Sequence, residues 1–336
     1  MTEFVVDREA IADSIVSCIG NTPLVHLNRV FPQKNIEVLA KLELMNPGGS
    51  MKDRSARFII EQGIREGSID KNSHIIESTS GNFGVALAMV CKNYNLAFTA
   101  VVDPKITKTN LKILGLLGAR IEMVNKPDDQ GGYLKTRINR IQKLLNEIPE
   151  AYWINQYANE RNWQAYFYDT AEEIIRQTNK PIDYLIAAVS TTGSILGCAR
   201  RMRENFPDIK VIAVDAVGSV IFGTPPEKRE LPGIGSSRIP ELLNREEIDQ
   251  IIHVNDKESI QGCRDLLDCE GIFAGGSSGS IVAAIKKISS SLPRHSRIVT
   301  ILPDRGERYL DSVYNDEWVN QLSKNNLGNT DEENEK

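Results

Sequence analysis

The sequence predicts an α/β protein built from parallel sheets flanked by helices. Short runs rich in Val and Ile alternate with helix-length amphipathic stretches along most of the 336 residues, as in parallel strands joined by covering helices. Apolar residues make up 41 % and charged residues 25 % of the chain, which are ordinary values for a folded globular protein. Because this length is about twice that of a typical domain, we expect two lobes.

Eight apolar segments are expected to be strands, each followed by a turn or by a helical pattern. In chain order they are Val38–Leu42, His74–Ile76, Ala97–Val102, Arg120–Val124, Tyr184–Val189, Val211–Asp215, Ile251–Val254 and Arg297–Leu302. Helical patterns fill the intervals between them. The clearest covers Gly132–Ile148, where apolar residues recur at spacings of three or four and form one stripe that faces the core. This stripe consists of Leu134, Ile138, Ile141 and Leu145.

Two segments depart from this alternation. Gly218–Ser237 is rich in Gly and Pro and is long for a connection within a compact domain, so it is either a functional loop or a mobile one. We favour a function. Ser323–Lys336 carries four acids, two lysines and one apolar side chain, too little apolar surface to offset the entropy of ordering the chain. We therefore expect residues 323–336 to form a disordered tail.

Charge and composition exclude several function classes. With 40 Lys+Arg against 45 Asp+Glu and a net charge of −5, the molecule has no overall basic field for nucleic acid or an anionic membrane. No apolar run approaches the roughly 20 residues of a membrane span, and the acidic N-terminus does not resemble a signal peptide. Five scattered cysteines without neighbouring histidines indicate reduced thiols and no metal site. We expect a cytoplasmic protein with no nucleic-acid or membrane partner.

Lys52 is the first candidate for chemistry. It follows the strand-like segment that ends near Leu44 and opens the helical run Ser55–Gly63. The preceding residues Pro47–Gly49 allow a tight turn, and a helix start offers free N–H groups to an anion. A phosphate-binding P-loop needs Ser or Thr after its lysine, and Asp53 excludes that motif. Taken alone, the segment favours a surface lysine after a turn.

Three further strand-to-helix junctions are rich in Gly, Ser and Thr. They are Glu77–Gly84, Val189–Ser194 and Ala274–Ser280. Each is compatible with an ordinary helix cap or with an anion-binding helix N-terminus. Together with Lys52 they indicate a small phosphorylated ligand held by neutral donors. The four histidines have no partner motif, so we assign none of them to catalysis.

Four motifs occur in the same order as in one known family. They are Ile19–Val25, Asn46–Arg54, Ser78–Asn82 and Pro303–Tyr309. The chain resembles the cysteine synthase (O-acetylserine sulfhydrylase) family of fold-type II pyridoxal-phosphate enzymes over roughly residues 11–320, and several motifs in register are more specific than any one of them. The resemblance implies a tryptophan synthase β-like fold, with a smaller lobe from residues 44–152 and a larger lobe from residues 11–43 and 153–322.

The resemblance also implies pyridoxal 5′-phosphate as cofactor. Lys52 corresponds to the catalytic lysine that holds the cofactor as a Schiff base, and Asn82 to the asparagine on the pyridine hydroxyl. The phosphate-binding loop corresponds to Ser190, Thr191, Thr192, Gly193 and Ser194. Ser277 corresponds to the residue that faces the pyridine nitrogen. A serine there cannot keep the ring nitrogen protonated as an aspartate would, which favours loss of a β-substituent over full carbanion delocalisation.

Substrate contacts are implied at positions that partly depart from the family. The loop that binds the substrate carboxylate in the family corresponds to Thr79, Ser80, Gly81 and Asn82. The phosphate loop reads Ser-Thr-Thr-Gly-Ser in place of Gly-Thr-Gly-Gly-Thr, and Phe83 stands where a threonine is common. The segments Gly131–Arg137 and Asn155–Asn159 add cationic and hydroxyl groups close to the site in the family fold.

A larger anionic substrate would therefore use Arg137, Tyr157 and Ser190. Arg137 is equally compatible with a solvated charge on a helix face. The loop Gly218–Ser237 and the following Arg238 would lie near the mouth of the site, and Arg238 is a further candidate substrate residue.

Two more segments, Ser219–Gly223 and Arg229–Gly235, narrow the resemblance to siderophore-pathway synthases of this family. It implies that O-phospho-L-serine loses phosphate to give an aminoacrylate, and that the amine of L-glutamate adds to Cβ. The product is a precursor of 2,3-diaminopropionate and would pass to a product-cleaving dehydrogenase. A homodimer is also implied.

Two alternatives stay open. One is a cysteine synthase that combines O-phosphoserine or O-acetylserine with sulfide, and the Ser-Thr-Thr-Gly-Ser loop argues against it. The other is a catalytically silent binding or regulatory module. The presence of Lys52, Asn82 and Ser277 argues against this alternative.

Overall fold

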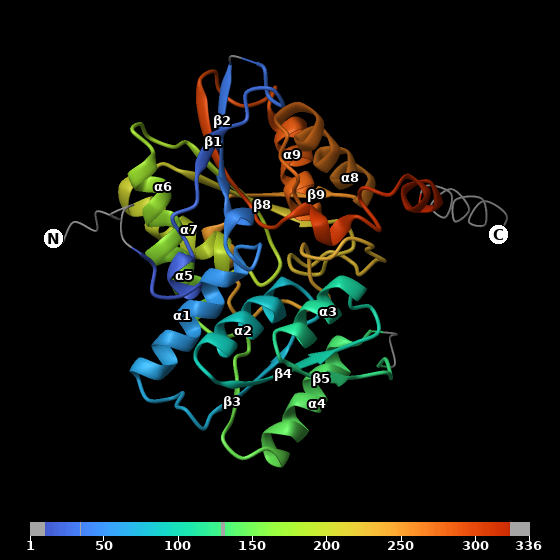
Figure 1. Cartoon of the computed structure of the whole chain (residues 1–336). Helices are drawn as coiled ribbons and strands as arrows, with labels where there is room; N and C mark the ends of the chain where they lie inside the picture. The colour runs from blue at the N-terminus through green and yellow to red at the C-terminus, as the bar shows by residue number, and fades with distance from the viewer. Residues whose placement is uncertain (1–10, 34, 129–131, 323–336) are drawn as a thin grey trace.

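Two separate sheets organise the chain in the computed structural model, which describes residues 11–33, 35–128 and 132–322 (Figure 1). The larger sheet has six strands in the order β1-β2-β10-β7-β8-β9, and the smaller has four in the order β5-β4-β3-β6. Neighbouring strands pair in parallel except β1, which is antiparallel to β2. The predicted α/β class with parallel sheets is confirmed.

The strands are short, and most are buried along their length. The larger sheet contains β1 (Leu24–His26), β2 (Ile36–Leu42), β7 (Tyr184–Ala188), β8 (Lys210–Ala216), β9 (Gln250–Val254) and β10 (Ser296–Leu302). The smaller sheet contains β3 (His74–Ser78), β4 (Ala97–Val102), β5 (Arg120–Met123) and β6 (Ala151–Trp153).

Helices connect the strands. The α-helices are α1 (Lys52–Arg65), α2 (Asn82–Asn93), α3 (Lys108–Leu116), α4 (Leu134–Glu147), α5 (Arg161–Ala165), α6 (Glu172–Gln177), α7 (Gly193–Asn205), α8 (Asp256–Asp265) and α9 (Gly276–Ile288). The other helical turns are η1 (Val16–Cys18), η2 (Glu43–Met45), η3 (Tyr166–Ala171), η4 (Arg245–Glu247), η5 (Leu266–Glu270) and η6 (Gly306–Tyr309). Of these, η3 and η5 are π-helical turns that continue α5 and α8.

Both faces of each sheet are covered, which explains the continuous apolar runs in the sequence. In the larger sheet, α5 and α7 pack on one face and α9 on the other, while α8 packs on α9 (Figure 1). In the smaller sheet, α2 shares one apolar cluster with α1, and α4 packs on the opposite face. Of the predicted stripe only Ile141 is fully buried, and Leu134, Ile138 and Leu145 are partly buried. The second fully buried residue of α4 is Leu144, which the predicted stripe did not include.

The eight predicted strands are all present, with ends that differ by at most two residues. β1 and β6 were not predicted, because a strand of three residues is too short to show an alternating pattern. The connection between β8 and η4 contains no helix or strand, yet hydrogen bonds secure it. The Gly235 N–H donates to Val189 O (2.7 Å) and the Val220 N–H donates to Ser236 O (3.0 Å), which ties this loop to the end of β7.

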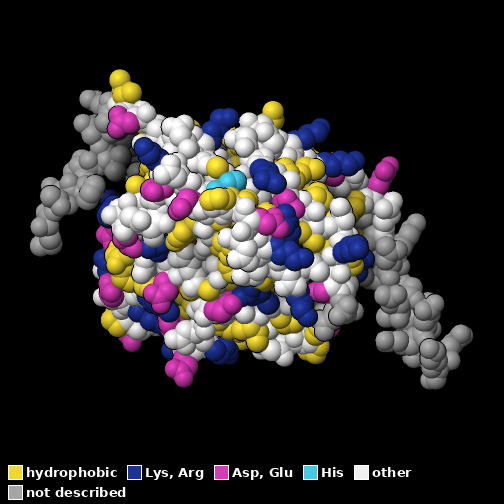
Figure 2. Space-filling view, turned by 90° about the horizontal axis from the view of Figure 1, so that it is seen from below, with side chains coloured by type: hydrophobic (Ala, Val, Ile, Leu, Met, Phe, Trp, Pro, Cys, Tyr) yellow, Lys and Arg dark blue, Asp and Glu magenta, His cyan; other side chains and the backbone are white. Residues whose placement is uncertain are grey.

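The surface carries both charge signs. On the face shown in Figure 2, Lys and Arg side chains are interspersed with Asp and Glu rather than gathered in one basic field. No helix in the described ranges is long and apolar enough to cross a membrane. Those ranges also contain no cluster of His, Cys, Asp and Glu that could hold a metal ion. The predicted tail 323–336 and Gly131 lie outside them.

Candidate active site

Lys52 is the first residue of α1 and follows a tight turn. In that turn the Gly49 N–H donates to Asn46 O (2.8 Å), and Gly49 has a φ of +82°, which favours glycine. Burial lowers the pKa of Lys52 from 10.5 to about 8, an effect that the charge of Asp304 opposes. A substantial fraction of this amine is therefore neutral and nucleophilic near physiological pH.

Arg54 anchors the first turn of α1 in a buried ionic network. Its guanidinium donates to both carboxylate oxygens of Glu43 (2.7 Å each) and to both of Glu173 (2.6 and 2.8 Å). Lys41 Nζ adds a bond to Glu173 Oε2 at 2.6 Å. Arg54, Glu43 and Lys41 are fully buried. The network joins α1 to the end of β2, to η2 and to α6, so it fixes the position from which Lys52 projects.

Asn82 begins α2, and both ends of its side-chain amide are engaged. Its Nδ2 donates to Asp304 Oδ2 (2.7 Å), and Arg308 donates to its Oδ1. Arg308 also donates to Gly48 O (2.5 Å) in the turn before Lys52. The two loops that carry Lys52 and Asn82 are therefore joined by residues from the end of the chain.

The segment Ser190–Ser194 lies where β7 leads into α7. Thr192 is the residue before α7, has a left-handed backbone (φ +63°), and its side chain makes no capping hydrogen bond. The first N–H groups of α7 are thus left without a side-chain cap, which suits an anion. Asn162 supports the loop by donating to Thr191 Oγ1 (3.1 Å). A Cβ at Gly193 would lie 2.8 Å from Asn162 Cγ, so this close packing requires glycine.

Ser277 lies in the first turn of α9 and is 2 % exposed. The residue before this helix, Gly275, has no side chain with which to cap it. The hydroxyl of the neighbouring Ser278 is buried and makes no hydrogen bond within the described residues. The Gly275 N–H donates to Asp304 O (2.9 Å), so the start of α9 lies beside the residue that binds Asn82.

The predicted substrate loop leads from β3 into α2. Thr79 Oγ1 accepts from the Gly84 N–H (2.9 Å), so this hydroxyl supports the loop itself. Gly81 is the residue before α2 and has no side chain with which to cap it, so the Asn82 and Phe83 N–H groups receive no side-chain hydrogen bond within the described residues. Ser80 Oγ accepts from Arg137 Nη1 (3.4 Å), which connects the loop to α4.

Arg137 is not a solvated helix-face charge. Its side chain is 13 % exposed, and its Nε lies 3.3 Å from Asp103 Oδ2. Tyr157 lies within electrostatic reach of Arg137, and burial raises the pKa of its phenol while Arg137 opposes the rise. The Arg238 guanidinium lies over the Tyr157 ring, 4.8 Å from its centroid, and also pairs with Glu241. The structure therefore brings Arg137, Tyr157 and Arg238 together with Ser80.

Comparison with known proteins places this arrangement in a family. The family model described as "Pyridoxal-phosphate dependent enzyme" matches residues 15–304. The chain belongs to this family. It is 58 % identical, over 95 % of its length and 94 % of the other protein, to the N-(2-amino-2-carboxyethyl)-L-glutamate synthase of Ralstonia nicotianae.

Solved structures of the same kind superpose on most of the chain. An O-acetylserine dependent cystathionine β-synthase from Helicobacter pylori has a TM-score of 0.84 at 33 % identity, covering 90 % of this chain and 98 % of that one. A hydrogen sulfide-producing enzyme from Fusobacterium nucleatum also has a TM-score of 0.84, at 32 % identity, covering 90 % and 99 %. An O-ureido-L-serine synthase has a TM-score of 0.83 at 29 % identity, covering 90 % and 95 %. The predicted fold-type II architecture and the pyridoxal-phosphate cofactor are confirmed.

The residues of this pyridoxal-phosphate dependent enzyme fit the cofactor. Lys52 provides a buried amine with a lowered pKa, as a covalent attachment to the aldehyde requires. The start of α7 provides helix N–H groups without a side-chain cap for the phosphate. Asn82 and Ser277 provide neutral polar groups beside them. The roles of the individual residues remain assignments by resemblance.

Three residues near this site were not singled out from the sequence: Asp304 and Glu77, which are buried, and Arg308, which is partly buried. Asp304 and Arg308 lie in the motif Pro303–Tyr309, which served only as a family marker, and nothing local indicated that they contact Asn82. Glu77 precedes the substrate loop and is 1 % exposed. Burial raises its pKa to about 8, and Gln156 Nε2 donates to its Oε1 (3.4 Å). The position of Glu77 directly before the motif Ser78–Asn82 could have identified it as a candidate site residue from the sequence.

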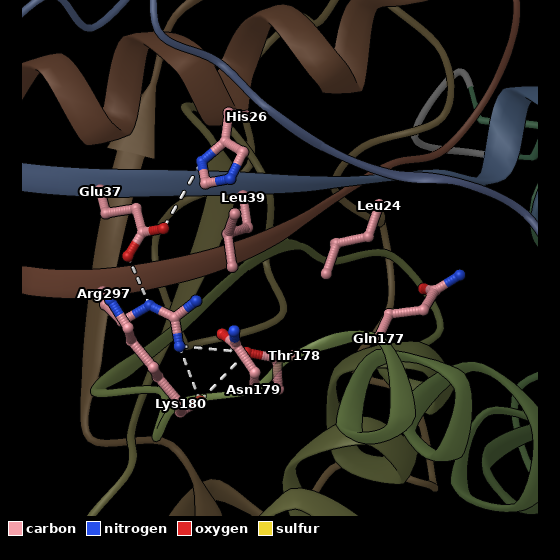
Figure 3. A pocket seen from close by; sticks show the side chains of 9 residues that line it. All are labelled: Leu24, His26, Glu37, Leu39, Gln177, Thr178, Asn179, Lys180 and Arg297. Atoms are coloured by element: carbon pink, nitrogen blue, oxygen red, sulfur yellow. Dashed lines mark hydrogen bonds and ion pairs between the residues drawn. The ribbon is translucent and has the colours of Figure 1, made fainter.

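A surface pocket of about 410 Å³ lies elsewhere, at the β1–β2 edge of the larger sheet (Figure 3). None of the predicted site residues lines it. Arg297 in this pocket donates to Glu37 Oε2 (2.5 Å), Thr178 Oγ1 (3.0 Å) and Lys180 O (2.6 Å). Because its guanidinium is occupied by these partners, the pocket is a poor site for an anion.

Proposed function

We propose that this enzyme joins the amine of L-glutamate to Cβ of O-phospho-L-serine and releases phosphate. The new bond links the glutamate nitrogen to Cβ, and the bond from Cβ to the phosphate oxygen breaks. The observation that carries the proposal is 58 % identity to a synthase of N-(2-amino-2-carboxyethyl)-L-glutamate over nearly the full length of both chains. The reaction would supply a precursor of 2,3-diaminopropionate.

Lys52 carries the proton in this proposal. Bound pyridoxal phosphate supplies an electron sink that makes the Cα proton of the substrate acidic. The Lys52 amine takes that proton before phosphate leaves and returns it to Cα after the new bond has formed. Its pKa of about 8 suits both tasks, because the amine is then poised between its neutral and charged forms near physiological pH.

The first substrate is held through its carboxylate by Thr79, Ser80, Gly81 and Asn82. These residues lead into α2, and the residue before this helix, Gly81, has no side chain with which to cap it. A helix N-terminus stabilises a carboxylate both by donating hydrogen bonds and through the helix dipole. The phosphate of O-phospho-L-serine requires further donors, and Ser190 lies at the neighbouring β7 loop.

The second substrate brings two carboxylates, and we assign them to Arg137, Tyr157 and Arg238. Arg137 Nε is buried and makes no hydrogen bond within the described residues, although Asp103 lies 3.3 Å away. An incoming carboxylate could form the bidentate hydrogen bonds that guanidinium groups favour, which are stronger than the present ion pair with Asp103 and the long hydrogen bond to Ser80. Sulfide, by contrast, carries no carboxylate and needs neither arginine.

Product analysis tests the proposal directly. The purified enzyme, loaded with pyridoxal phosphate, is incubated with O-phospho-L-serine and either L-glutamate or sulfide. We expect N-(2-amino-2-carboxyethyl)-L-glutamate and phosphate in equal amounts, with glutamate preferred to sulfide. Cysteine as the dominant product in a competition with both nucleophiles would overturn the glutamate assignment in favour of a cysteine synthase.

Arg137→Met probes the second-substrate site. A hydrogen bond to a charged group contributes about 1.5–3 kcal/mol, so we expect kcat/KM for glutamate to fall about 10- to 150-fold. The rate of the sulfide reaction should change much less. Arg140→Met is the matched control, because Arg140 is on the same helix but pairs with Glu122 and Glu147. An equal loss with both nucleophiles would contradict a specific role in binding glutamate.

The biological setting is proposed on the family resemblance. We propose a homodimer in the cytoplasm, with lobes formed by residues 44–152 and by residues 11–43 with 153–322. The product, a secondary amine that links two amino acids, would be cleaved by a partner dehydrogenase.

A further inference from the structure

The segment Pro303–Tyr309, here called the closing segment, contacts three of the four segments assigned to the cofactor: the turn before Lys52, the start of α2 and the start of α9. The Met51 N–H donates to Pro303 O (2.8 Å), and the Arg305 N–H donates to Gly49 O (3.2 Å), which binds the segment to the turn before Lys52. The Gly275 N–H donates to Asp304 O (2.9 Å), which binds it to the start of α9. Asp304 and Arg308 supply the side-chain contacts to Asn82.

The Asp304 carboxyl lies at the meeting point of these elements and is 1 % exposed. Its Oδ2 accepts from Asn82 Nδ2 and from the Tyr309 hydroxyl, at 2.7 Å each. Its Oδ1 is buried and makes no hydrogen bond within the described residues. A Cβ at Gly275 would lie 2.2 Å from this Oδ1, so the carboxyl is packed against the residue before α9.

Asp304 and Arg308 together fix the direction of the Asn82 amide. The carboxylate can only accept from this amide and the guanidinium can only donate to it. A flipped amide would place its oxygen against the carboxylate and its NH₂ against the guanidinium, and would lose both bonds. Asp304 also bears on Lys52, because its negative charge favours the ammonium form and opposes the effect of burial on the Lys52 pKa.

We propose that Asp304 is a positioning residue of the cofactor site. It orients the Asn82 amide from a segment whose backbone also binds the turn before Lys52 and the start of α9. The proposal concerns the cofactor and not the nucleophile, so it holds or fails independently of the glutamate assignment.

Two substitutions at residue 304 test this positioning role. Asp304→Ala removes both the charge and the acceptor, whereas Asp304→Asn removes the charge and keeps an acceptor of similar shape. The dissociation constant for pyridoxal phosphate is measured by titrating the apoprotein and following the visible absorbance of the bound cofactor. We expect about tenfold weaker binding in Asp304→Ala and a smaller loss in Asp304→Asn. Asp311→Asn, at an exposed position, should stay within about twofold of the unmodified protein. Binding within twofold in both Asp304 variants would overturn the proposal.

A double-mutant cycle distinguishes positioning from general destabilisation. If Asp304 acts through Asn82, Asp304→Ala should weaken cofactor binding much less in the Asn82→Ala background than in the unmodified protein. Equal losses in both backgrounds would contradict the coupling. Should Asp304→Ala fail to fold, the same cycle with Asp304→Asn gives the answer.

Discussion

Lys52 and Glu77 show how burial acts in opposite directions on a base and an acid. Because burial disfavours the charged form of either group, it lowers the pKa of Lys52 from 10.5 to about 8 and raises that of Glu77 from 4.5 to about 8. Two groups that would be fully charged at neutral pH in solution are thus close to titration in the folded protein. For Lys52 this is useful to catalysis, whereas for Glu77 it has a consequence for stability.

Glu77→Gln should stabilise the apoprotein in a pH-dependent way. The raised pKa means that the protonated carboxyl favours the folded state. That contribution is fully present below the unfolded pKa near 4.5 and is lost as the pH rises through about 8. Glutamine mimics the protonated acid, so the unfolding temperature of Glu77→Gln should exceed that of the unmodified protein by about 2 °C or more at pH 8.5. The difference should shrink as the pH falls and nearly vanish only at about pH 4.5 or below, where the carboxyl is protonated in both the folded and the unfolded states. The exposed Glu317→Gln is the control, and a pH-independent difference would contradict this pKa.

At the level of elements, α1 carries Lys52, the proposed catalytic lysine, at one end and is anchored two residues later by Arg54. The anchor crosses between distant parts of the chain, since Arg54 is 119 residues from Glu173. A fully buried network of this kind costs desolvation but defines one geometry when every charge has its partner. The position of Lys52 therefore depends on Arg54 and on the two carboxylates that it binds, Glu43 and Glu173.

Arg54→Met should reveal this dependence as a loss of stability. It leaves Glu43 and Glu173 buried without the guanidinium that binds both, so the free energy of unfolding should fall by about 3–5 kcal/mol. Arg57→Met, on the same helix, breaks a half-exposed pair with Asp169 and should cost about 1 kcal/mol or less. Urea unfolding of the two apoproteins measures the difference. Equal losses would show that the network contributes no more than a surface ion pair.

The sequence predicted the strands better than it predicted contacts between residues far apart in the chain. Strands such as Ala97–Val102 were recognisable because burial on both faces demands uninterrupted apolar residues. The three-residue strands β1 and β6 were not recognisable, because only their pairing with neighbouring strands identifies segments this short as strands. Lys52 and Asn82 were identified through motifs, but the bond from Asn82 to Asp304 joins residues 222 apart and no local pattern reveals it. Arg137 was undecided for the same reason, since its burial depends on the loop that follows β3.

At the level of the whole molecule, the cofactor should act as a stabilising ligand. The groups assigned to it come from both halves of the chain, so binding favours the complete folded state over the unfolded one. At a free concentration 100 times the dissociation constant, the gain is about 2.7 kcal/mol. Thermal unfolding with and without pyridoxal phosphate should show a higher unfolding temperature with the cofactor. Lys52→Ala should show a smaller shift, because it lacks the covalent attachment. No shift in the unmodified protein would favour a silent module.

The position of β10 has a consequence for synthesis of the chain. This strand lies between β2 and β7 in the larger sheet. Its Arg297 contacts Glu37 on β2, and these two residues are 260 positions apart in the chain. The centre of the larger sheet is thus filled by the strand that comes last among the described strands. A nascent chain that ends before β10 has an open gap between two strand edges and also lacks the closing segment. Completion of the larger sheet therefore has to wait for β10, and we expect this sheet to form slowly because its central pairings join residues far apart in the chain.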